Sequence, residues 1–459
     1  MDHREFQAID AALHEMLVDK EGLRPIDRLL AALKSASSSD EEMKMVRKVI
    51  RCIQQPERKV RLKGTIDENN LPFARSVAAL AKRRALSKPE QDSPDCPIRE
   101  VGTGLDFLAT TCFPPHMTLI QAINLALLRR IRPSKSAAVV ATVRDEGLYL
   151  LESVAFSRAI GLTDIFIYTN DNIDGSDELL DLLANHRIIR LIRNIVGPGT
   201  NPQTKAYQHA LHLLHDLRQF KWVLFLDVDE FLVLNSRYDY EVGKFIRLVE
   251  SSCRGNLPGA VVFPWDWRLS DRAYNRTAGL LFERYPHSIP HFCVKSLTRL
   301  EVALSMCRIH LPMLSDGARY LDSDLAPVAE DVVWGPSPKS NLGGSIAHFW
   351  GKSFEEFAIK KRKGDRLSLE GELFFRNFDH FFQWTAKPTP DNLHPAPAVL
   401  LARMRRHLAE LHALPGVGDA VGQIESNSKR LSRALEREIH LKAIYRKMSA
   451  AIPPAMDPA

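Results

Sequence analysis

The stretch Trp222–Leu234, which reads WVLFLDVDEFLVL, decides the fold. It begins with five apolar residues, mostly aromatic or branched, a pattern typical of a strand buried on both faces of a sheet. Asp227, Asp229 and Glu230 follow directly, and they cannot belong to the core because burying unpaired charge is costly. We therefore expect them at the carboxyl edge of an open sheet, where α/β proteins bind ligands. The alternative is a solvated acidic turn after an ordinary strand.

The two aspartates of this stretch are candidate metal ligands. Asp227 and Asp229 are two residues apart, so on an extended chain they point the same way. Their carboxylate oxygens suit one hard divalent cation, Mn²⁺ or Mg²⁺.

Strands and helices alternate on the N-terminal side of this stretch. Strands are expected at 137–143, 164–168 and 188–192, and helices at 148–160, 177–185 and 204–217. The C-terminal side is less regular, with a helix at 240–251 and strands at 260–263, 293–300 and 345–349. This order predicts an α/β fold with a doubly wound, mostly parallel sheet.

Three regions are expected along the chain. Residues 1–135 have the spacing of short amphipathic helices followed by a Pro- and Asp-rich linker, residues 136–395 form the α/β domain, and residues 396–459 form a C-terminal helical extension. Within the extension, Ile424, Leu431, Leu435 and Ile439 make an apolar stripe suited to core packing or to a homodimer contact.

Composition narrows the class of protein. The hydrophobic content of 45% and the charged content of 26% are those of an ordinary globular protein. A net charge of +6 without a dense basic stripe excludes a nucleic-acid signature but suits an anionic substrate. The six cysteines form no CxxC pair, and neither a signal peptide nor an apolar run of about 20 residues appears. We expect a cytoplasmic protein, with peripheral contact at the inner face of the membrane as a further candidate.

Polar loops follow three of the predicted parallel strands. They lie at 144–146, 170–174 and 227–230, and the carboxyl ends of parallel strands share one edge of a sheet. Such an edge can hold a nucleotide in its first two loops and a metal against a diphosphate at the third. A divalent cation stabilises the charge of a diphosphate leaving group.

An ordered set of short motifs carries a resemblance to a known family. The set consists of VRDE at 143–146, YTNDN at 168–172, DGS at 174–176, QTKAY at 203–207, FLDVDEFL at 225–232, VKS at 294–296 and AHFWGKSFEEF at 347–357. Residues of about 136–365 resemble glycosyltransferases of the GT-A fold, in particular the family-2-like bacterial branch that shares its pattern with family 92.

The resemblance implies a role for several residues. It implies that Asp227 and Asp229 form the DxD metal motif and that Asp171, with Asn172 beside it, reads the base. Nucleotide or phosphate contacts are implied for Arg144, Glu146 and Lys205, although Lys205 departs in part from the family pattern.

His348 and Lys352 follow the last predicted strand. Related enzymes often complete the metal site with such a histidine and contact the diphosphate with a lysine shortly after it, so the resemblance implies these roles here. Neutral imidazole suits Mn²⁺. The alternatives are a core or capping role for His348, and His310 as the rival ligand.

A catalytic base is required if the reaction inverts the sugar configuration, because a carboxylate must then accept the proton of the acceptor hydroxyl. Glu283 is the first candidate, Asp266 the second, and Asp331 is also in the right half of the domain. A retaining mechanism remains an alternative.

The sequence thus predicts a metal-dependent, hexosyltransferase-like glycosyltransferase. It would move a sugar from a nucleotide-sugar donor, a UDP-sugar, to a saccharide or glycolipid acceptor in surface polysaccharide biosynthesis. One alternative is a nucleotidyltransferase, although residues 144–147 read RDEG and not a glycine-rich basic loop. The other is a non-catalytic carbohydrate-binding module.

Overall fold

The computed structural model describes residues 97–109, 133–252, 257–270, 272–306, 308–315, 317–329, 342–362, 378, 381–382 and 388–451. Most of the region 1–135 that was expected to be helical, together with the candidate base Asp331, lies outside the described residues.

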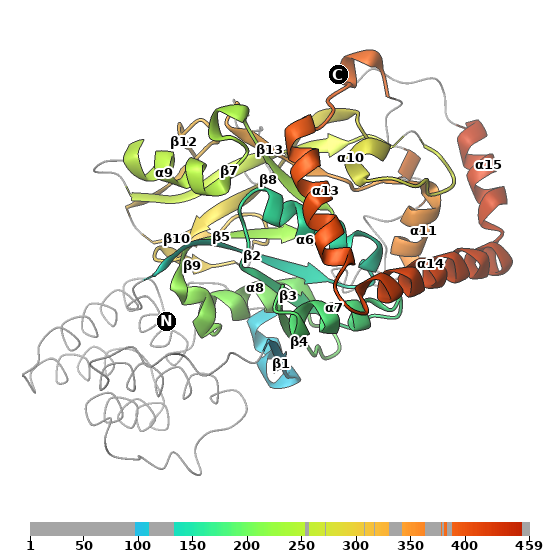
Figure 1. The fold of residues 1–459 in the computed structure, drawn as a ribbon, viewed down its shortest axis with the longest axis horizontal. Helices are drawn as coiled ribbons and strands as arrows, with labels where there is room; N and C mark the ends of the chain where they lie inside the picture. Colours follow the sequence, from blue (N-terminus) through green and yellow to red (C-terminus); the bar gives the residue numbers. More distant parts are fainter. Residues whose placement is uncertain are drawn as a thin grey trace, which may run out of the picture.

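One large mixed sheet organises the described part of the chain (Figure 1). Its strands run in the order β1-β4-β3-β2-β5-β8-β7-β11-β12, with β6 and β13 attached beside β7. Their bounds are β1 Ile98–Val101, β2 Lys135–Val143, β3 Ile165–Thr169, β4 Arg190–Asn194, β5 Phe220–Asp227, β6 Glu230–Leu234, β7 Leu257–Arg268, β8 Ser288–Arg299, β11 Ala318–Leu321, β12 Pro327–Val328 and β13 Gly344–His348. A separate hairpin pairs β9 (Ala303–Ser305) with β10 (Met313–Leu314).

The sheet has a parallel half and a mixed half that meet at β5. Strands β1, β4, β3, β2 and β5 pair in parallel. Strand β8 then pairs antiparallel with both β5 and β7, and β13 pairs antiparallel with β6 and parallel with β7. The predicted α/β fold class with a mostly parallel, doubly wound sheet is therefore confirmed.

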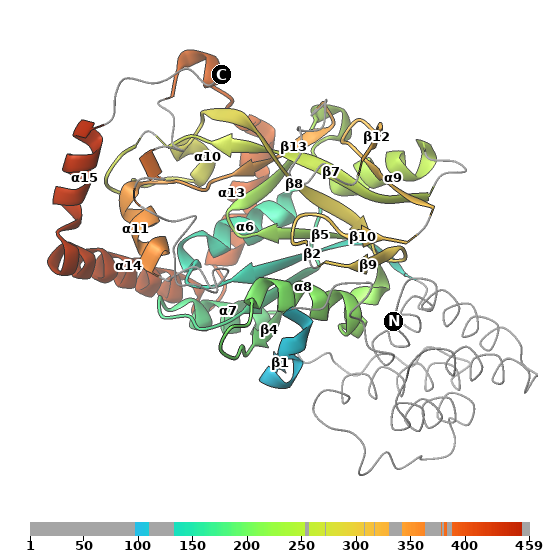
Figure 2. The same cartoon turned by 180° about the vertical axis from the view of Figure 1, so that it is seen from behind.

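Helices cover both faces of the sheet. They are α6 Gly147–Ala159, α7 Ser176–Asn185, α8 Pro202–His212, α9 Val242–Ser252, α10 Leu281–Arg284, α11 Phe354–Arg362, α13 Ala398–His412, α14 Val417–Ile439 and α15 Leu441–Ala451, with short 3₁₀ turns η1 Thr103–Ala109, η2 His215–Gln219, η3 Ser236–Tyr238 and η5 Pro390–Asn392. Helices α6 and α13 lie together in front of the sheet in Figure 1. Helix α8 is on the opposite face, which Figure 2 brings to the front, and it packs against η1.

Described segments on both sides of the expected α/β domain join this core more closely than the predicted boundaries imply. Strand β1 was expected to be part of a linker, but it extends the sheet by pairing with β4. In the C-terminal extension, Leu400, Met404 and Ile424 are buried in the same core as helix α6. Leu435 is also buried, whereas Ile439 is 39% exposed, so the apolar stripe packs largely inside the chain.

No helix of the described residues combines the length and the apolar character needed to cross a bilayer.

Candidate active site

The turn between β5 and β6 carries the three acids of the opening stretch. Asp227 is partly exposed, whereas Asp229 and Glu230 are buried. Glu230 holds the turn in shape, because its Oε2 accepts a hydrogen bond from the backbone N–H of Asp227 at 3.1 Å and pairs with Lys295 Nζ at 3.1 Å. Lys295 also reaches Asp227 Oδ2 at 3.3 Å. Glu230 is therefore a positioning residue for the two aspartates.

A second contact fixes Asp227 from the opposite face of the sheet. Helix α8 begins after Asn201, whose side chain caps it by accepting from the N–H groups of Gln203 and Thr204. Gln203 Nε2 then donates to Asp227 Oδ1 at 2.6 Å. Both carboxylate oxygens of Asp227 are thus engaged, while the side chain keeps 30% of its surface exposed.

Two lysines converge on the buried carboxylate of Asp229. Lys352 Nζ donates to Oδ2 at 2.6 Å, and Lys360 Nζ of α11 donates to the same oxygen at 2.7 Å. Burial alone would raise the pKa of Asp229, but these two ammonium groups outweigh it and hold that pKa well below its ordinary value. The carboxylate is therefore ionised, and both ammonium groups share its one oxygen.

Lys352 is held in place by its own support. Its backbone has a φ of 53°, an uncommon left-handed conformation for a lysine, and its ammonium lies 4.5 Å from the centre of the Tyr149 ring. Tyr149 donates to Glu356 Oε1 at 2.9 Å, and Ser353 Oγ donates to the other carboxylate oxygen at 2.8 Å. Strain maintained in this way is characteristic of functional sites.

His348 ends β13 and faces the same carboxylate. Its Nε2 lies 3.9 Å from Asp229 Oδ1, beyond hydrogen-bond distance. Burial lowers its pKa well below the ordinary value, so the imidazole is neutral at pH 7. Its Nδ1 is buried and has no hydrogen-bond partner within the described part of the chain.

The loops after β2 and β3 are locked to one another. Asn172 Oδ1 accepts from the Asp145 N–H at 2.7 Å, and Asp145 Oδ1 accepts from the N–H of Ile173. Asp174 Oδ2 accepts from the Gly147 N–H at 2.9 Å at the start of α6. Asn172, predicted to contact the nucleotide, thus uses its amide to join the two loops, since it also donates to Thr169 and Asp177.

The other predicted residues of these loops lie along the same edge. Asp171 is exposed at the tip of its loop with a φ of 48°, and Arg144 is half-buried directly after β2. Glu146 Oε1 pairs with Lys360 Nζ at 3.3 Å, which connects the first loop to Asp229 through one ammonium group. The sequence is therefore right that the loops at 144–146, 170–174 and 227–230 share one edge.

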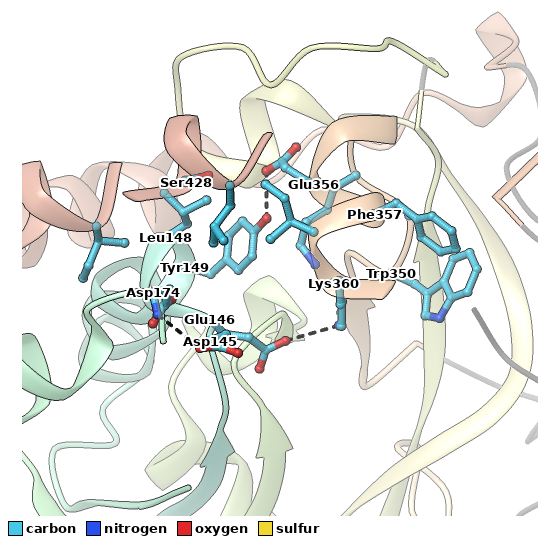
Figure 3. Close-up of a pocket in the computed structure, with 15 residues that line it drawn as sticks. Asp145, Glu146, Leu148, Tyr149, Asp174, Trp350, Glu356, Phe357, Lys360 and Ser428 are labelled. Carbon is cyan, nitrogen blue, oxygen red and sulfur yellow. Dashed lines mark hydrogen bonds and ion pairs between the residues drawn. The ribbon is translucent and has the colours of Figure 1, made fainter. Parts of the chain in front are cut away.

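A pocket opens beside this cluster between α6, α11 and α14. Figure 3 shows Lys360 extending towards Glu146, and Tyr149 hydrogen-bonded to Glu356. Leu148, Trp350 and Ile424 add apolar walls, and Ser428 of α14 adds a hydroxyl. The C-terminal extension thus forms one wall of the site.

Lys205 is placed differently from the prediction. Its side chain is fully buried on α8, where Nζ donates to Asp106 Oδ1 at 2.7 Å and to the carbonyls of Gly102 and Ile195 at 2.9 and 2.5 Å. Burial lowers its pKa, and the Asp106 carboxylate opposes that effect. This lysine ties η1 to the sheet, and all three of its donors are used there.

Neither candidate base faces the acidic turn. Glu283 Oε2 accepts from the Leu280 N–H at 2.9 Å, and its Oε1 pairs with Arg405 of α13, so it caps the short helix α10. Asp266 pairs with Arg268 at 2.9 Å. Because side chains alternate along a strand, Asp266 points to the face of β7 opposite its neighbours Trp265 and Trp267, whose rings contact His348. The structure favours structural roles for both acids.

The cluster fits a divalent cation only in part. Among the described residues, no group of three or more acidic, histidine or cysteine side chains is gathered around one point, so Asp227, Asp229 and His348 are not preassembled as a triad. Asp229 and His348 do face one another, and they offer an ionised oxygen and a neutral nitrogen, a donor set suited to Mn²⁺. Protein sites for Mg²⁺ often supply only one or two ligands and leave the rest to substrate phosphates and water. The residues thus fit a site that a bound diphosphate completes.

Sequence reasoning assigned no role to Lys295, Lys360 and Gln203. Lys295 and Gln203 stand inside the quoted motifs, so their position was a usable signal. The sequence signal for Lys360 is weaker: the residue lies eight positions after Lys352, on the helix that follows β13.

Comparison with known proteins agrees with the geometry. Residues 140–278 match the model of glycosyltransferase family 92, a range that contains all three loops of the edge. The chain is also 29% identical over 101 residues to a glycosyltransferase family 92 protein of rice, Oryza sativa subsp. japonica. That match covers 22% of this chain, and the chain spans only 17% of the length of the rice protein. Residues 140–278, which carry the three loops, are therefore similar to a glycosyltransferase domain of the family-92 type.

Proposed function

We propose that the protein transfers a sugar from a UDP-sugar to a hydroxyl group of a saccharide or glycolipid acceptor. The observation that carries this proposal is the buried Asp229 carboxylate with two lysine ammonium groups on one oxygen, at the carboxyl edge of the parallel half of the sheet. The two ammonium groups can also donate to a ligand that brings negative charge of its own.

The lysines supply the means to bind a diphosphate. Lys360 is 16% exposed and Lys352 is 2% exposed, so both charges are largely shielded from water. Electrostatic attraction to a phosphate oxygen is stronger in such surroundings than in solvent. We assign to Lys352 and Lys360 the stabilisation of charge that develops on the diphosphate as it leaves.

Asp229 and His348 are the residues that would hold the cation, with Asp227 beside them on the turn. A bound Mn²⁺ or Mg²⁺ would neutralise charge on the leaving diphosphate. Lys295, Glu230 and Gln203 hold the two aspartates in position through the contacts described above.

The nucleoside is assigned to the loops after β2 and β3. Asp171 projects from its loop and is accessible, and Arg144 and Glu146 lie on the neighbouring loop. Because Asn172, Asp145 and Asp174 fix these loops to one another, the surface that meets the base is rigid before the ligand arrives.

The product released from a nucleotide sugar tests this function. Purified protein is incubated with Mn²⁺ and a panel of UDP-sugars, and the released UDP is measured. A parallel reaction contains UTP and a sugar 1-phosphate, and the released pyrophosphate is measured there. We expect slow release of UDP through transfer to water, its loss in Asp229→Asn, and its retention in the control Asp391→Asn, whose side chain is exposed on η5. Release of pyrophosphate in the parallel reaction would favour a nucleotidyltransferase, and unchanged UDP release in Asp229→Asn would remove Asp229 from the site.

A further inference from the structure

A row of aromatic and imidazole rings leads from the surface to the acidic turn. It begins at Phe292, which is 44% exposed, and continues through His291, whose ring stacks on Phe292 with centroids 4.3 Å apart. His291 contacts Trp267 at 4.5 Å and stacks on Trp265 at 5.5 Å. Trp265 then contacts His348 at 4.2 Å, next to Asp229. We call these five rings the aromatic row.

The aromatic row lies in the mixed half of the sheet, across β5 from the nucleotide loops. Strand β5 pairs with β8 at Trp222 to Leu224, opposite Arg299 to Leu297, whereas the row uses the other end of β8. Among the described strands, β7 alone pairs with that end of β8, so these two strands continue past the acidic turn. Figure 1 shows β7, β8 and β13 on the side of β5 away from β3 and β4. The nucleotide loops after β2 and β3 and the aromatic row therefore approach Asp229 from opposite sides.

The row presents flat surfaces without charge. Burial lowers the pKa of His291 to about 4, so its ring is neutral at pH 7. His310, which packs on Trp265 with centroids 5.2 Å apart, is neutral for the same reason. A ligand at the outer end of the row would meet the exposed Phe292 ring and the half-buried His291, without net charge, in contrast to the lysines across the turn.

Two polar atoms of the row lack partners. The Nε1–H of Trp265 and Nδ1 of His348 are buried, and neither makes a hydrogen bond within the described residues. Trp265 is only 9% exposed and His348 only 5%, so bulk water does not readily replace the missing bonds. Buried polar groups are normally paired, so such atoms call for a ligand or an ordered water.

We propose that the aromatic row is the acceptor subsite, and that it binds an uncharged saccharide with one sugar ring stacked on Phe292 and His291. This proposal rests on the proposed function, because it names the second substrate of the same site. The apolar face of a sugar ring suits the exposed face of Phe292, and an ordered water or a hydroxyl group that enters the row can pair with the unpartnered nitrogens. The row ends beside His348 and Asp229, where the donor sugar would lie.

Ligand-observed NMR with three neutral disaccharides, cellobiose, lactose and maltose, tests the subsite without any reaction. Phe292→Ala removes the exposed ring, and Val399→Ala is the control, because Val399 is 52% exposed and lies on α13, which packs against α6. We expect at least one disaccharide to bind the wild-type protein and Phe292→Ala to weaken it about tenfold, which corresponds to about 1.4 kcal/mol. Val399→Ala should leave the affinity unchanged. Phe292→Trp, which keeps an aromatic ring at this position, should bind the disaccharide as the wild type does.

The result that overturns the subsite is either the absence of disaccharide binding to the wild-type protein or equal affinity in Phe292→Ala. UDP binding measured on the same samples separates the two proposals. A wild-type protein that does not bind UDP would contradict the donor site, and the disaccharide affinities would still test the aromatic row. Unchanged UDP binding in Phe292→Ala is expected, because Phe292 lies across β5 from the nucleotide loops.

Discussion

Replacing Lys205 by Met separates the stability of the fold from the chemistry of the site. The substitution leaves the Asp106 carboxylate without its cation and the carbonyls of Gly102 and Ile195 without their donor. Removing one member of a buried ion pair costs about 3–5 kcal/mol. The Asp106 side chain is 24% exposed, so water compensates in part and we expect the lower end, about 3 kcal/mol. The two carbonyls add about 1 kcal/mol.

The expected result is a free energy of unfolding lowered by about 4 kcal/mol, read from the midpoint of urea denaturation. The affinity for UDP, measured well below that midpoint, should be unchanged. Adding Asp106→Asn should recover part of the loss, because the amide leaves no buried charge behind. The reasoning is refuted if Lys205→Met keeps wild-type stability and loses UDP binding, since Lys205 would then contact the nucleotide as the sequence suggests.

Three further predictions concern pH and charge. Burial lowers the pKa of His209, His212 and His310 to about 3 and that of His291 to about 4. Because these histidines take up protons near pH 6.5 in the unfolded chain, the free energy of unfolding should fall below that pH by about 1.4 kcal/mol per histidine per pH unit. Urea midpoints that stay constant from pH 7 to pH 5 would contradict this. Burial raises the pKa of Glu152 to about 7, so its ionisation lowers the stability of the wild-type protein as the pH rises from about 4.5 to about 7. Between pH 5 and pH 8, the free energy of unfolding of Glu152→Gln should therefore rise by up to about 3 kcal/mol relative to that of the wild type. A difference between the two proteins that does not change with pH would argue against this. Lys360→Met should weaken UDP binding about tenfold by removing one charge-assisted contact, whereas its neighbour Lys361→Met should not, and equal affinities by calorimetry would exclude Lys360 from the site.

The parallel half of the sheet could be predicted because its signals are local. The apolar run at 222–226 became β5 at Phe220–Asp227, and the ends of the strands expected at 137–143 and 164–168 lie within two residues of those of β2 and β3. Strand order along the chain then placed the polar loops at one edge, as the structure shows.

Strand β1 could not be predicted, because its sequence IREV follows a Pro-rich segment and has no strand pattern of its own. Its pairing with β4 supplies what the local sequence lacks. The late strands β7 and β8 were underestimated for a related reason. Their outer halves, such as residues 288–293, mix polar and apolar residues without a clear alternation, and their pairing with each other defines them as strands.

Side-chain roles were predicted less well, because they depend on contacts between distant segments. Lys205 is bound by Asp106, 99 residues away, and Glu283 by Arg405, 122 residues away. A lysine or glutamate that binds substrate and one that holds the fold together look alike in a sequence. Asp229 was different, because an acid that directly follows a buried strand is costly to bury unless a positive charge or a ligand is close by.

Calorimetric titration of UDP with Mn²⁺ into the wild-type protein and Asp229→Asn tests the central claim most directly. The account predicts that UDP binds the wild-type protein, more tightly with Mn²⁺ than without it, and that Asp229→Asn loses the metal-dependent part of the affinity. A wild-type protein that does not bind UDP, or an Asp229→Asn variant that binds UDP and Mn²⁺ as the wild type does, would contradict it.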